Sequence, residues 1–214
     1  MKKIFFLIFI AVILLVTPII SALNLDVKKT SENEIMVAGV DKPVVFEFDI
    51  KNLGTDAEIE FYNLVGFRIL PTGLTLIKSF ETEHIILQVS PIGDFDHLGA
   101  YTFTYYIRDT EEVEIEDTLT FRRLNIEDVL EIGADEFNPE SSSLSVYVRN
   151  KENFDFGNVN VKFSSSFFNV EESFDLGPTE KRSFTVDLNQ EDFKQLLAGF
   201  YTMKGEIIAN DAKA

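Results

Sequence analysis

Beyond residue 22 the chain alternates apolar and polar residues with a period of two, and turn residues interrupt this alternation repeatedly. In the run 45–51, Phe46, Phe48 and Ile50 lie on one face of an extended strand. Successive strand side chains point to opposite faces, so one side of this strand is expected to face a core. Further alternating runs begin near Ile59, Ile85, Tyr101 and Val113. Short strands at this spacing predict an all-β, antiparallel, immunoglobulin-like sandwich.

The second part of the chain repeats the first. Three landmarks recur, at separations of 98, 97 and 100 residues. The strand end Ile50-Lys51-Asn52 recurs at Val148, which Arg149-Asn150-Lys151 follow. The other two are Thr82-Glu83-His84 with Thr179-Glu180-Lys181, and Gly99-Ala100-Tyr101-Thr102 with Gly199-Phe200-Tyr201-Thr202. The second landmark equates Phe184 with Leu87. A nearly constant offset with matching parity predicts two tandem sandwiches of one design.

We therefore expect one sandwich over residues 23–124 and another over residues 125–214. The joining segment is short, which predicts an elongated pair in loose contact. The second copy stops at Ala214, soon after the strand that begins at Tyr201, so we expect it to lack its last strand. Two explanations stay open: the protein continues into further domains or a membrane anchor, or a partner subunit donates a strand to the open edge.

The first 22 residues differ from the rest in pattern. Lys2 and Lys3 precede an apolar run, and small residues follow it up to Ala22. This order is typical of a secretory signal peptide cleaved after Ala22. The alternative is a retained membrane anchor, because Ile4 to Ile20 reaches the lower length limit of a spanning helix. Both alternatives place the remainder outside the cytoplasm, secreted or at the cell surface.

Charge and cysteine content narrow the function classes. The chain has 36 acidic and 19 basic residues, a net charge of −17, and no cysteine. An acidic surface repels phosphate backbones and anionic headgroups, so we expect no nucleic-acid partner. We expect membrane contact only through the N-terminal segment or a C-terminal anchor beyond this sequence. The absence of cysteine excludes disulfides, thiolate nucleophiles and a lipid-modified cysteine.

Few residues are candidates for chemistry. Asp94, Asp96 and His97 form an acidic loop that could hold calcium or a transition ion, although a plain surface turn explains the same residues. The sequence carries no P-loop, dinucleotide loop or serine–histidine–aspartate pattern. We therefore expect a non-enzymatic protein without metal or cofactor.

Exposed aromatic residues are the candidates for partner binding. Phe167 and Phe168 are adjacent, so both cannot face inward from one strand, and one could mark a contact patch. Tyr62, Tyr106 and Tyr147 fall on outward positions and could contact sugar faces with their rings.

The turns carry a resemblance to a known family. The segment Phe48–Thr55, the turn Leu176-Gly177-Pro178-Thr179-Glu180-Lys181 and the two Gly-x-Tyr-Thr strand starts resemble the cell-adhesion-related (CARDB-like) immunoglobulin domains of prokaryotic surface proteins. The second copy departs from the pattern because Asn150-Lys151-Glu152-Asn153 lacks the glycine, and the first copy lacks the Leu-Gly-Pro turn. The aliphatic leader and the acidic, cysteine-free body are similar to those of archaeal surface proteins.

The resemblance implies a structural or adhesive spacer and carries no catalytic residues. The sequence thus favours a non-catalytic, exported cell-surface protein that acts as a spacer or as an adhesion and protein-interaction module. Its partners are expected to be proteins or cell-envelope components. The alternative is a module that binds carbohydrate or another envelope polymer.

Overall fold

The computed structural model describes residues 23–93, 95–135, 141–166, 168–188, 191, 202–209 and 212–213. The leader over residues 1–22 and the repeated landmark at 199–201 lie outside these residues. Among the helices of the described part, none has the length and apolar character needed to span a bilayer.

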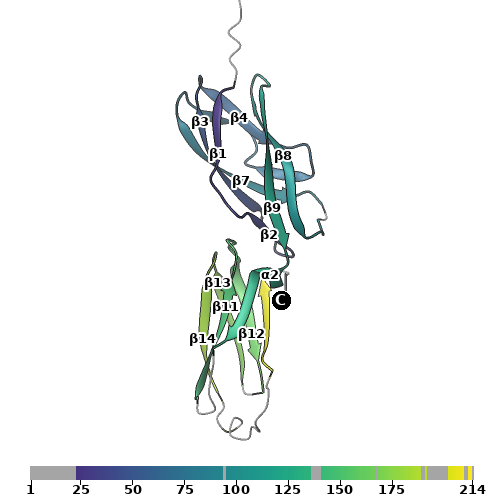
Figure 1. Cartoon of the computed structure of the whole chain (residues 1–214), viewed down its shortest axis with the longest axis vertical. Coiled ribbons are helices and arrows are strands. Elements are labelled where there is room, and N and C mark those ends of the chain that lie inside the picture. Colours follow the sequence, from purple (N-terminus) through teal and green to yellow (C-terminus); the bar gives the residue numbers. More distant parts are fainter. Residues whose placement is uncertain are drawn as a thin grey trace, which may run out of the picture.

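The described chain forms two β-sandwiches placed end to end (Figure 1). We call strands β1–β9 the N-terminal sandwich and strands β10–β16 the C-terminal sandwich. Strand pairs are antiparallel, except that β2 runs parallel to β9. The predicted all-β, tandem immunoglobulin-like fold is confirmed.

The N-terminal sandwich has a four-stranded and a five-stranded sheet. The first has the order β1 (Leu25–Lys29), β3 (Val44–Asn52), β7 (Thr82–Pro91) and β5 (Phe67–Leu70). The second has the order β2 (Ile35–Val37), β9 (Glu114–Leu124), β8 (Gly99–Asp109), β4 (Ala57–Tyr62) and β6 (Thr75–Ile77). Phe46, Phe48 and Ile50 are at most 1% exposed, as their alternation predicts. Burying each such side chain contributes roughly 2 kcal/mol.

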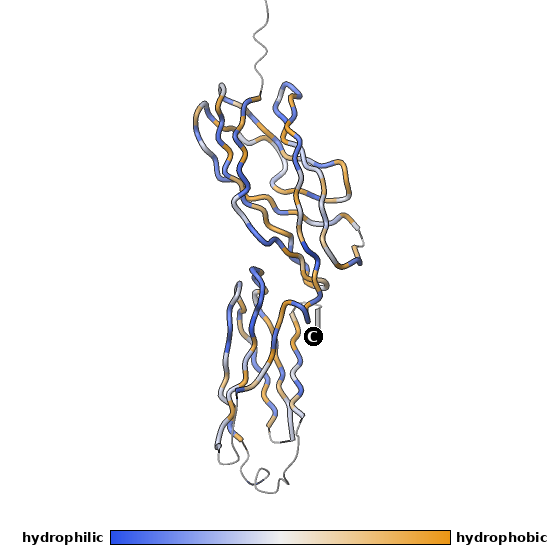
Figure 2. Tube along the Cα trace, viewed as in Figure 1, coloured by the Kyte–Doolittle hydropathy of each residue, from blue (hydrophilic) through white to orange (hydrophobic). Residues whose placement is uncertain are grey.

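The C-terminal sandwich begins after a one-turn helix, α2 (Ile126–Val129). One sheet has the order β10 (Leu130–Ala134), β11 (Ser143–Asn150) and β14 (Lys181–Asp187). The other has the order β13 (Asn169–Leu176), β12 (Gly157–Ser164), β15 (Lys204–Ala209) and β16 (Ala212–Lys213). Apolar residues alternate with polar ones along the strands of both sandwiches (Figure 2).

Strand register corrects one part of the sequence alignment. Phe48 pairs with Ile85 in the N-terminal sandwich, and Val146 pairs with Phe184 in the C-terminal one. Phe184 therefore corresponds to Ile85, and its equation with Leu87 is wrong by two residues. A shift of two residues keeps a side chain on the same face of a strand, which is why sequence parity did not reveal the error.

A buried asparagine occupies the same place in each sandwich. Asn52 donates from Nδ2 to the carbonyl oxygens of Thr55 and Ile77, and Asn150 donates to those of Phe154 and Gly177. The two residues are 1% and 0% exposed. In both, the side-chain oxygen accepts the backbone N–H two residues ahead. Each amide thus ties the end of one strand to a segment of the facing sheet.

The two sandwiches share a hydrophobic cluster at their junction. Ile35, Val37 and Val40 belong to the core of the C-terminal sandwich, whereas Met36 belongs to the core of the N-terminal one. Strand β2 therefore presents alternate residues to two cores. Ion pairs join Lys42 to Asp155 and Arg122 Nη2 to Glu152 Oε2, the latter at 3.0 Å. The pair of sandwiches is elongated, as expected (Figure 1). The contact between them is larger than the loose contact we expected, because it includes a shared hydrophobic cluster and two ion pairs.

Candidate functional site

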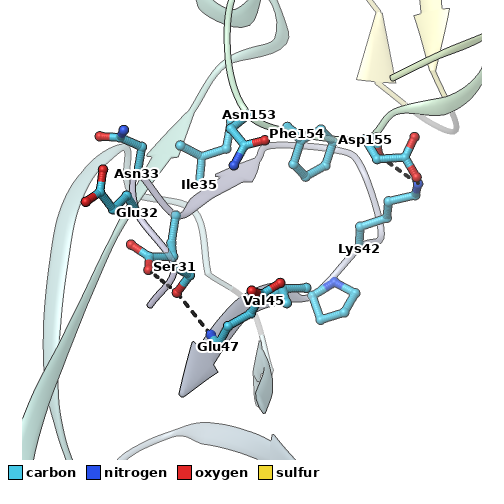
Figure 3. Close-up of a pocket in the computed structure, with 12 residues that line it drawn as sticks. Ser31, Glu32, Asn33, Ile35, Lys42, Val45, Glu47, Asn153, Phe154 and Asp155 are labelled. Carbon is cyan, nitrogen blue, oxygen red and sulfur yellow. Dashed lines mark hydrogen bonds and ion pairs between the residues drawn. The ribbon is translucent and has the colours of Figure 1, made fainter. Parts of the chain in front are cut away.

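A cleft lies at the junction of the two sandwiches and has a volume of about 260 Å³. It is lined by residues 31–35, by residues 153–155 of the C-terminal sandwich, and around the start of β3 by Lys42, Pro43, Val45 and Glu47. Asn153, Phe154 and Asp155 lie across the cleft from Val45 and Glu47 (Figure 3). The site therefore exists only when both sandwiches are in place.

The floor and one side of the cleft are apolar. Ile35 and Phe154 are 3% and 7% exposed, so they form a fixed floor that belongs to the shared hydrophobic cluster. Pro43 and Val45 continue this apolar lining toward the outer surface, where Val45 is 42% exposed. An apolar side chain of a ligand could leave water by contacting these residues.

The polar groups at one end of the cleft satisfy each other. Ser31 Oγ donates to Glu34 Oε1 at 2.6 Å and accepts the Glu47 N–H at 3.0 Å. Burial alone would raise the pKa of Glu34, but hydrogen bonds from Lys29 and Ser31 outweigh it and lower the pKa. Glu34 is therefore an ionised, internally paired carboxylate, which is the wrong protonation state for a general acid.

The opposite end is closed by an ion pair between the sandwiches. Lys42 Nζ donates to the Asp155 carbonyl at 2.7 Å and lies 3.3 Å from Asp155 Oδ2. The pKa of Asp155 is lowered chiefly by the hydrogen bond from the Gly157 N–H, and also by Lys42. Lys42 is thus already paired, so the cleft does not offer it to an anionic ligand.

The remaining rim of the cleft is polar: Asn33 and Asn153 line it together with two glutamates. Glu32 is exposed at the cleft. The Glu47 side chain is 45% exposed, and its Oε2 lies 4.0 Å from His84 Nε2. Figure 3 places these two glutamates at the side opposite Lys42. An apolar floor with an acidic rim suits recognition of a group that is both apolar and basic.

The predicted metal-site residues are placed as follows. Asp94 lies outside the described residues, and Asp96 and His97 are both exposed. The His97 carbonyl accepts a hydrogen bond from the Tyr101 hydroxyl at 2.6 Å, which ties this loop to the start of β8. Within the described ranges, no group of three or more histidine, aspartate or glutamate side chains has a geometry that could hold a metal ion.

Tyr62 and Tyr106 come together on the outer face of the five-stranded sheet. They are direct partners across β4 and β8, and their rings stack with centroids 5.0 Å apart. The Arg108 guanidinium lies 4.8 Å from the centroid of the Tyr62 ring. The Tyr62 hydroxyl donates to Glu114, and this hydrogen bond raises the pKa of the tyrosine.

The other aromatic candidates lie in the C-terminal sandwich. The Tyr147 hydroxyl donates to Glu131 Oε1 at 2.9 Å, which raises the tyrosine pKa, and Lys181 Nζ lies 3.8 Å from the ring centroid. Phe168 is partly buried against the C-terminal core, and Phe167 lies outside the described residues. The structure brings neither Tyr147 nor Phe168 to the junction cleft.

Sequence reasoning missed the cleft because its walls are more than 100 residues apart in the chain. One signal was present. In the run Val44-Val45-Phe46, Val45 occupies an outward position of β3 that alternation would give to a polar residue. An apolar residue at an outward position is a pointer to a contact surface, although single cases are common.

No protein-family model matches the sequence, and no curated protein matches it. The YadV chaperone is 9% identical with a TM-score of 0.33, and the match covers 88% of this chain and 98% of that one. A protein of unknown function from Porphyromonas gingivalis W83 is 9% identical with a TM-score of 0.33, covering 78% and 85%. The periplasmic chaperone SfaE is 14% identical with a TM-score of 0.32, covering 88% and 96%. Similarity this low transfers no function to this chain.

Proposed function

We propose that this protein is a non-catalytic, extracytoplasmic spacer whose two sandwiches form one rigid rod that also binds protein neighbours. The shared hydrophobic cluster at the junction is the observation that supports the proposal. Ile35, Val37 and Val40 are buried among residues of the C-terminal sandwich. Bending the junction would return these side chains to water at roughly 2 kcal/mol each.

The proposal includes a location outside the cytoplasm and a relation to CARDB-like domains. Residues 1–22 have the pattern of a signal peptide or anchor, which supports a location outside the cytoplasm for the sandwiches proposed at 23–124 and 125–214. The turn motifs around Asn52 and Asn150 support a relation to CARDB-like domains, since both asparagines have a structural role in those turns.

Small-angle X-ray scattering of the purified full chain tests the rod. We expect a single elongated envelope whose maximum dimension does not change with salt. Val37→Asp, which places a charge in the shared cluster, should broaden the distance distribution, and Thr118→Asp on the outer face of β9 is the matched control. A wild-type chain as flexible as Val37→Asp would contradict the spacer. Protease accessibility on intact cells tests the location.

A second candidate function is binding of carbohydrate or another envelope polymer at Tyr62 and Tyr106. The stacked pair on an outer sheet face favours it, because aromatic rings contact sugar faces. The tyrosine faces are partly used already, since Arg108 and Tyr106 both contact the Tyr62 ring. A glycan array with wild type and Tyr106→Ala decides: binding lost in the variant supports this function, and no glycan bound by either protein contradicts it.

A further inference from the structure

Three exposed aliphatic residues lie together on the outer face of the four-stranded sheet. Val45, Ile86 and Leu70 are 42%, 47% and 40% exposed. Val45 and Leu70 pair with Gln88 from its two sides, and Ile86 pairs with Glu47, the next outward residue of β3. Ile86 is therefore a diagonal neighbour of both Val45 and Leu70, within reach of side-chain contact.

This patch is confined to the end of the sheet next to the junction. Toward the other end of the same outer face the residues are polar or charged, namely Asp49, Lys51 and His84 on β3 and β7 and Asp26 and Lys28 on β1. Val45 also lines the junction cleft. The aliphatic patch is thus continuous with the floor formed by Ile35 and Phe154. We call the patch and the cleft together the junction surface.

The charges around the junction surface are mostly negative where the patch meets the cleft. Glu32 is exposed there and the Glu47 side chain is 45% exposed, while Lys29 is paired with Glu34 and Lys42 with Asp155. Lys28 of β1 is exposed and is a diagonal neighbour of Glu47 across β1 and β3. Arg68 lies at the far edge of the patch on β5 and is exposed. Among the described residues, no lysine or arginine forms an ion pair with Glu32 or Glu47. A partner that covers the patch and enters the cleft therefore meets these two carboxylates.

We propose that the junction surface binds a partner protein that presents aliphatic side chains flanked by lysine or arginine. One aliphatic side chain enters the cleft above Ile35 and Phe154, and the neighbouring aliphatic residues cover Val45 and Ile86. The basic residues pair with Glu32 and Glu47. This inference rests on the proposed function, of which it names the binding surface and the partner chemistry.

Charge complementarity selects this occupant over the alternatives. A second copy would bring another chain with a net charge of −17 against the two glutamates. Anionic membranes and nucleic acids would be repelled in the same way. A basic and aliphatic protein segment satisfies both parts of the surface, because it removes apolar area from water and supplies the missing cations.

A phage library that displays random 12-residue peptides is the probe. It is panned against the purified full chain after depletion on Val45→Glu, whose fold is checked by circular dichroism. We expect the enriched peptides to combine aliphatic residues with lysine or arginine. By fluorescence anisotropy, the best synthetic peptide should bind at least tenfold more weakly to Val45→Glu and to Ile86→Glu. Thr118→Glu adds the same charge to the outer face of the other sheet and should leave binding unchanged.

The acidic rim is tested separately with Glu47→Gln and Glu32→Gln. Each substitution should weaken binding of the peptide by about threefold to tenfold. The effect should be smaller at high salt, because the lost contact is between charges. Failure to enrich such peptides, or binding that Val45→Glu does not weaken, would overturn the proposal. So would dimerisation of the wild type that Val45→Glu abolishes, because a second copy would then be the occupant. None of these outcomes alters the scattering and location tests, so the spacer function fails or stands independently.

Discussion

The two sandwiches keep the same polar anchor and fill their cores differently. Asn52 and Asn150 make corresponding hydrogen bonds, although the carbonyl in the adjacent turn belongs to the third residue after Asn52 and to the fourth after Asn150. An unsatisfied buried amide is costly, so a residue in this place has few substitutes. The comparison shows that the repeat is held most strictly where a buried polar group must be satisfied.

The two cores fill the same space with different side chains. One has a large residue on β8 and a small one on β1, and the other has a small residue on β15 and a larger one on β10. Ile107 and Ile207 correspond, because they pair with Phe61 and Val161 at the same place in β4 and β12. Two residues before them stand Tyr105, which is 1% exposed, and Gly205. A Cβ on Gly205 would lie 2.2 Å from Ile132 Cδ1, so this isoleucine takes up space beside the glycine. The counterpart of Ile132 in β1 is the smaller Val27.

The segment between β4 and β7 also differs from its counterpart between β12 and β14. In the N-terminal sandwich it splits into β5, which pairs with β7, and β6, which pairs with β4. In the C-terminal sandwich β13 is one eight-residue strand that pairs only with β12 among the described strands. Among the described strands, the sheet of β10, β11 and β14 has no counterpart of β5, the strand that carries Leu70. Divergence of this segment has given the N-terminal sandwich the strand that carries one residue of its aliphatic patch.

The largest loss in the free energy of unfolding should come from Tyr105, the core position that differs most between the two sandwiches. Tyr105→Ala removes a buried aromatic ring and should lower the free energy of unfolding of the N-terminal sandwich by about 4 kcal/mol. Urea denaturation followed by hydrogen exchange assigns the loss to one sandwich. Tyr106→Ala, on the outer face beside it, is the control. An equal loss in both variants would show that Tyr105 does not fill a core position.

Because Asn52 and Asn150 have the same role, removing either should lower the free energy of unfolding of its own sandwich by the same amount. Asn52→Ala and Asn150→Ala each leave buried backbone carbonyls without a donor, so each should cost about 3 kcal/mol in its own sandwich. Asn160→Ala, at an exposed position of β12, should cost less than about 0.5 kcal/mol. A large loss for one asparagine and none for the other would break the equivalence of the two anchors.

Gly205→Ala should have a smaller effect. The added methyl group meets the terminal carbon of Ile132, a flexible contact, so we expect the free energy of unfolding to fall by about 1 kcal/mol. Ile132→Val removes that terminal carbon, and the double variant should regain part of the loss relative to Ile132→Val alone. Thermal unfolding of the four proteins gives the coupling. Strict additivity would mean that the two residues do not share one volume.

The smallest effect concerns the ion pair that joins the copies. The pKa of Asp155 is lowered in the folded protein, so its contribution is present at neutral pH and is lost as the pH falls through that lowered pKa. Lys42→Met should therefore cost less than about 1 kcal/mol at pH 7, and less again in acid, where only the hydrogen bond of Lys42 to the Asp155 carbonyl remains. Denaturation of wild type, Lys42→Met, Asp155→Asn and the double variant tests this at both pH values. A coupling that is unchanged in acid would contradict the assignment.

The sequence was sufficient to predict most of the strands, but it was insufficient to predict how the two sandwiches contact each other. Period-two alternation identified the buried faces of β3 and β7 because each strand has one side in a single core. It could not identify β2, because Ile35 and Val37 face one core and Met36 faces another, which leaves no polar face to read. The cleft likewise depends on how the two sandwiches meet, which no local pattern encodes.

The burial of Asn52 also could not be predicted from a local sequence pattern. The turn motif marked it as a turn residue, but its burial depends on the Ile77 carbonyl, which approaches only when the two sheets close on each other. The candidate tyrosines were outward as their parity predicts, yet their environment was set by Arg108 and Glu131 on neighbouring strands.

The double-faced strand β2 imposes an order on biogenesis. Synthesis proceeds from the N-terminus, so Ile35, Val37 and Val40 emerge more than 100 residues before Phe154 and Val186, with which they share a cluster. Until those later residues arrive, the nascent N-terminal sandwich carries an uncovered aliphatic edge, which is a site of aggregation in a crowded compartment. Maturation of the first sandwich is thereby coupled to delivery of the second.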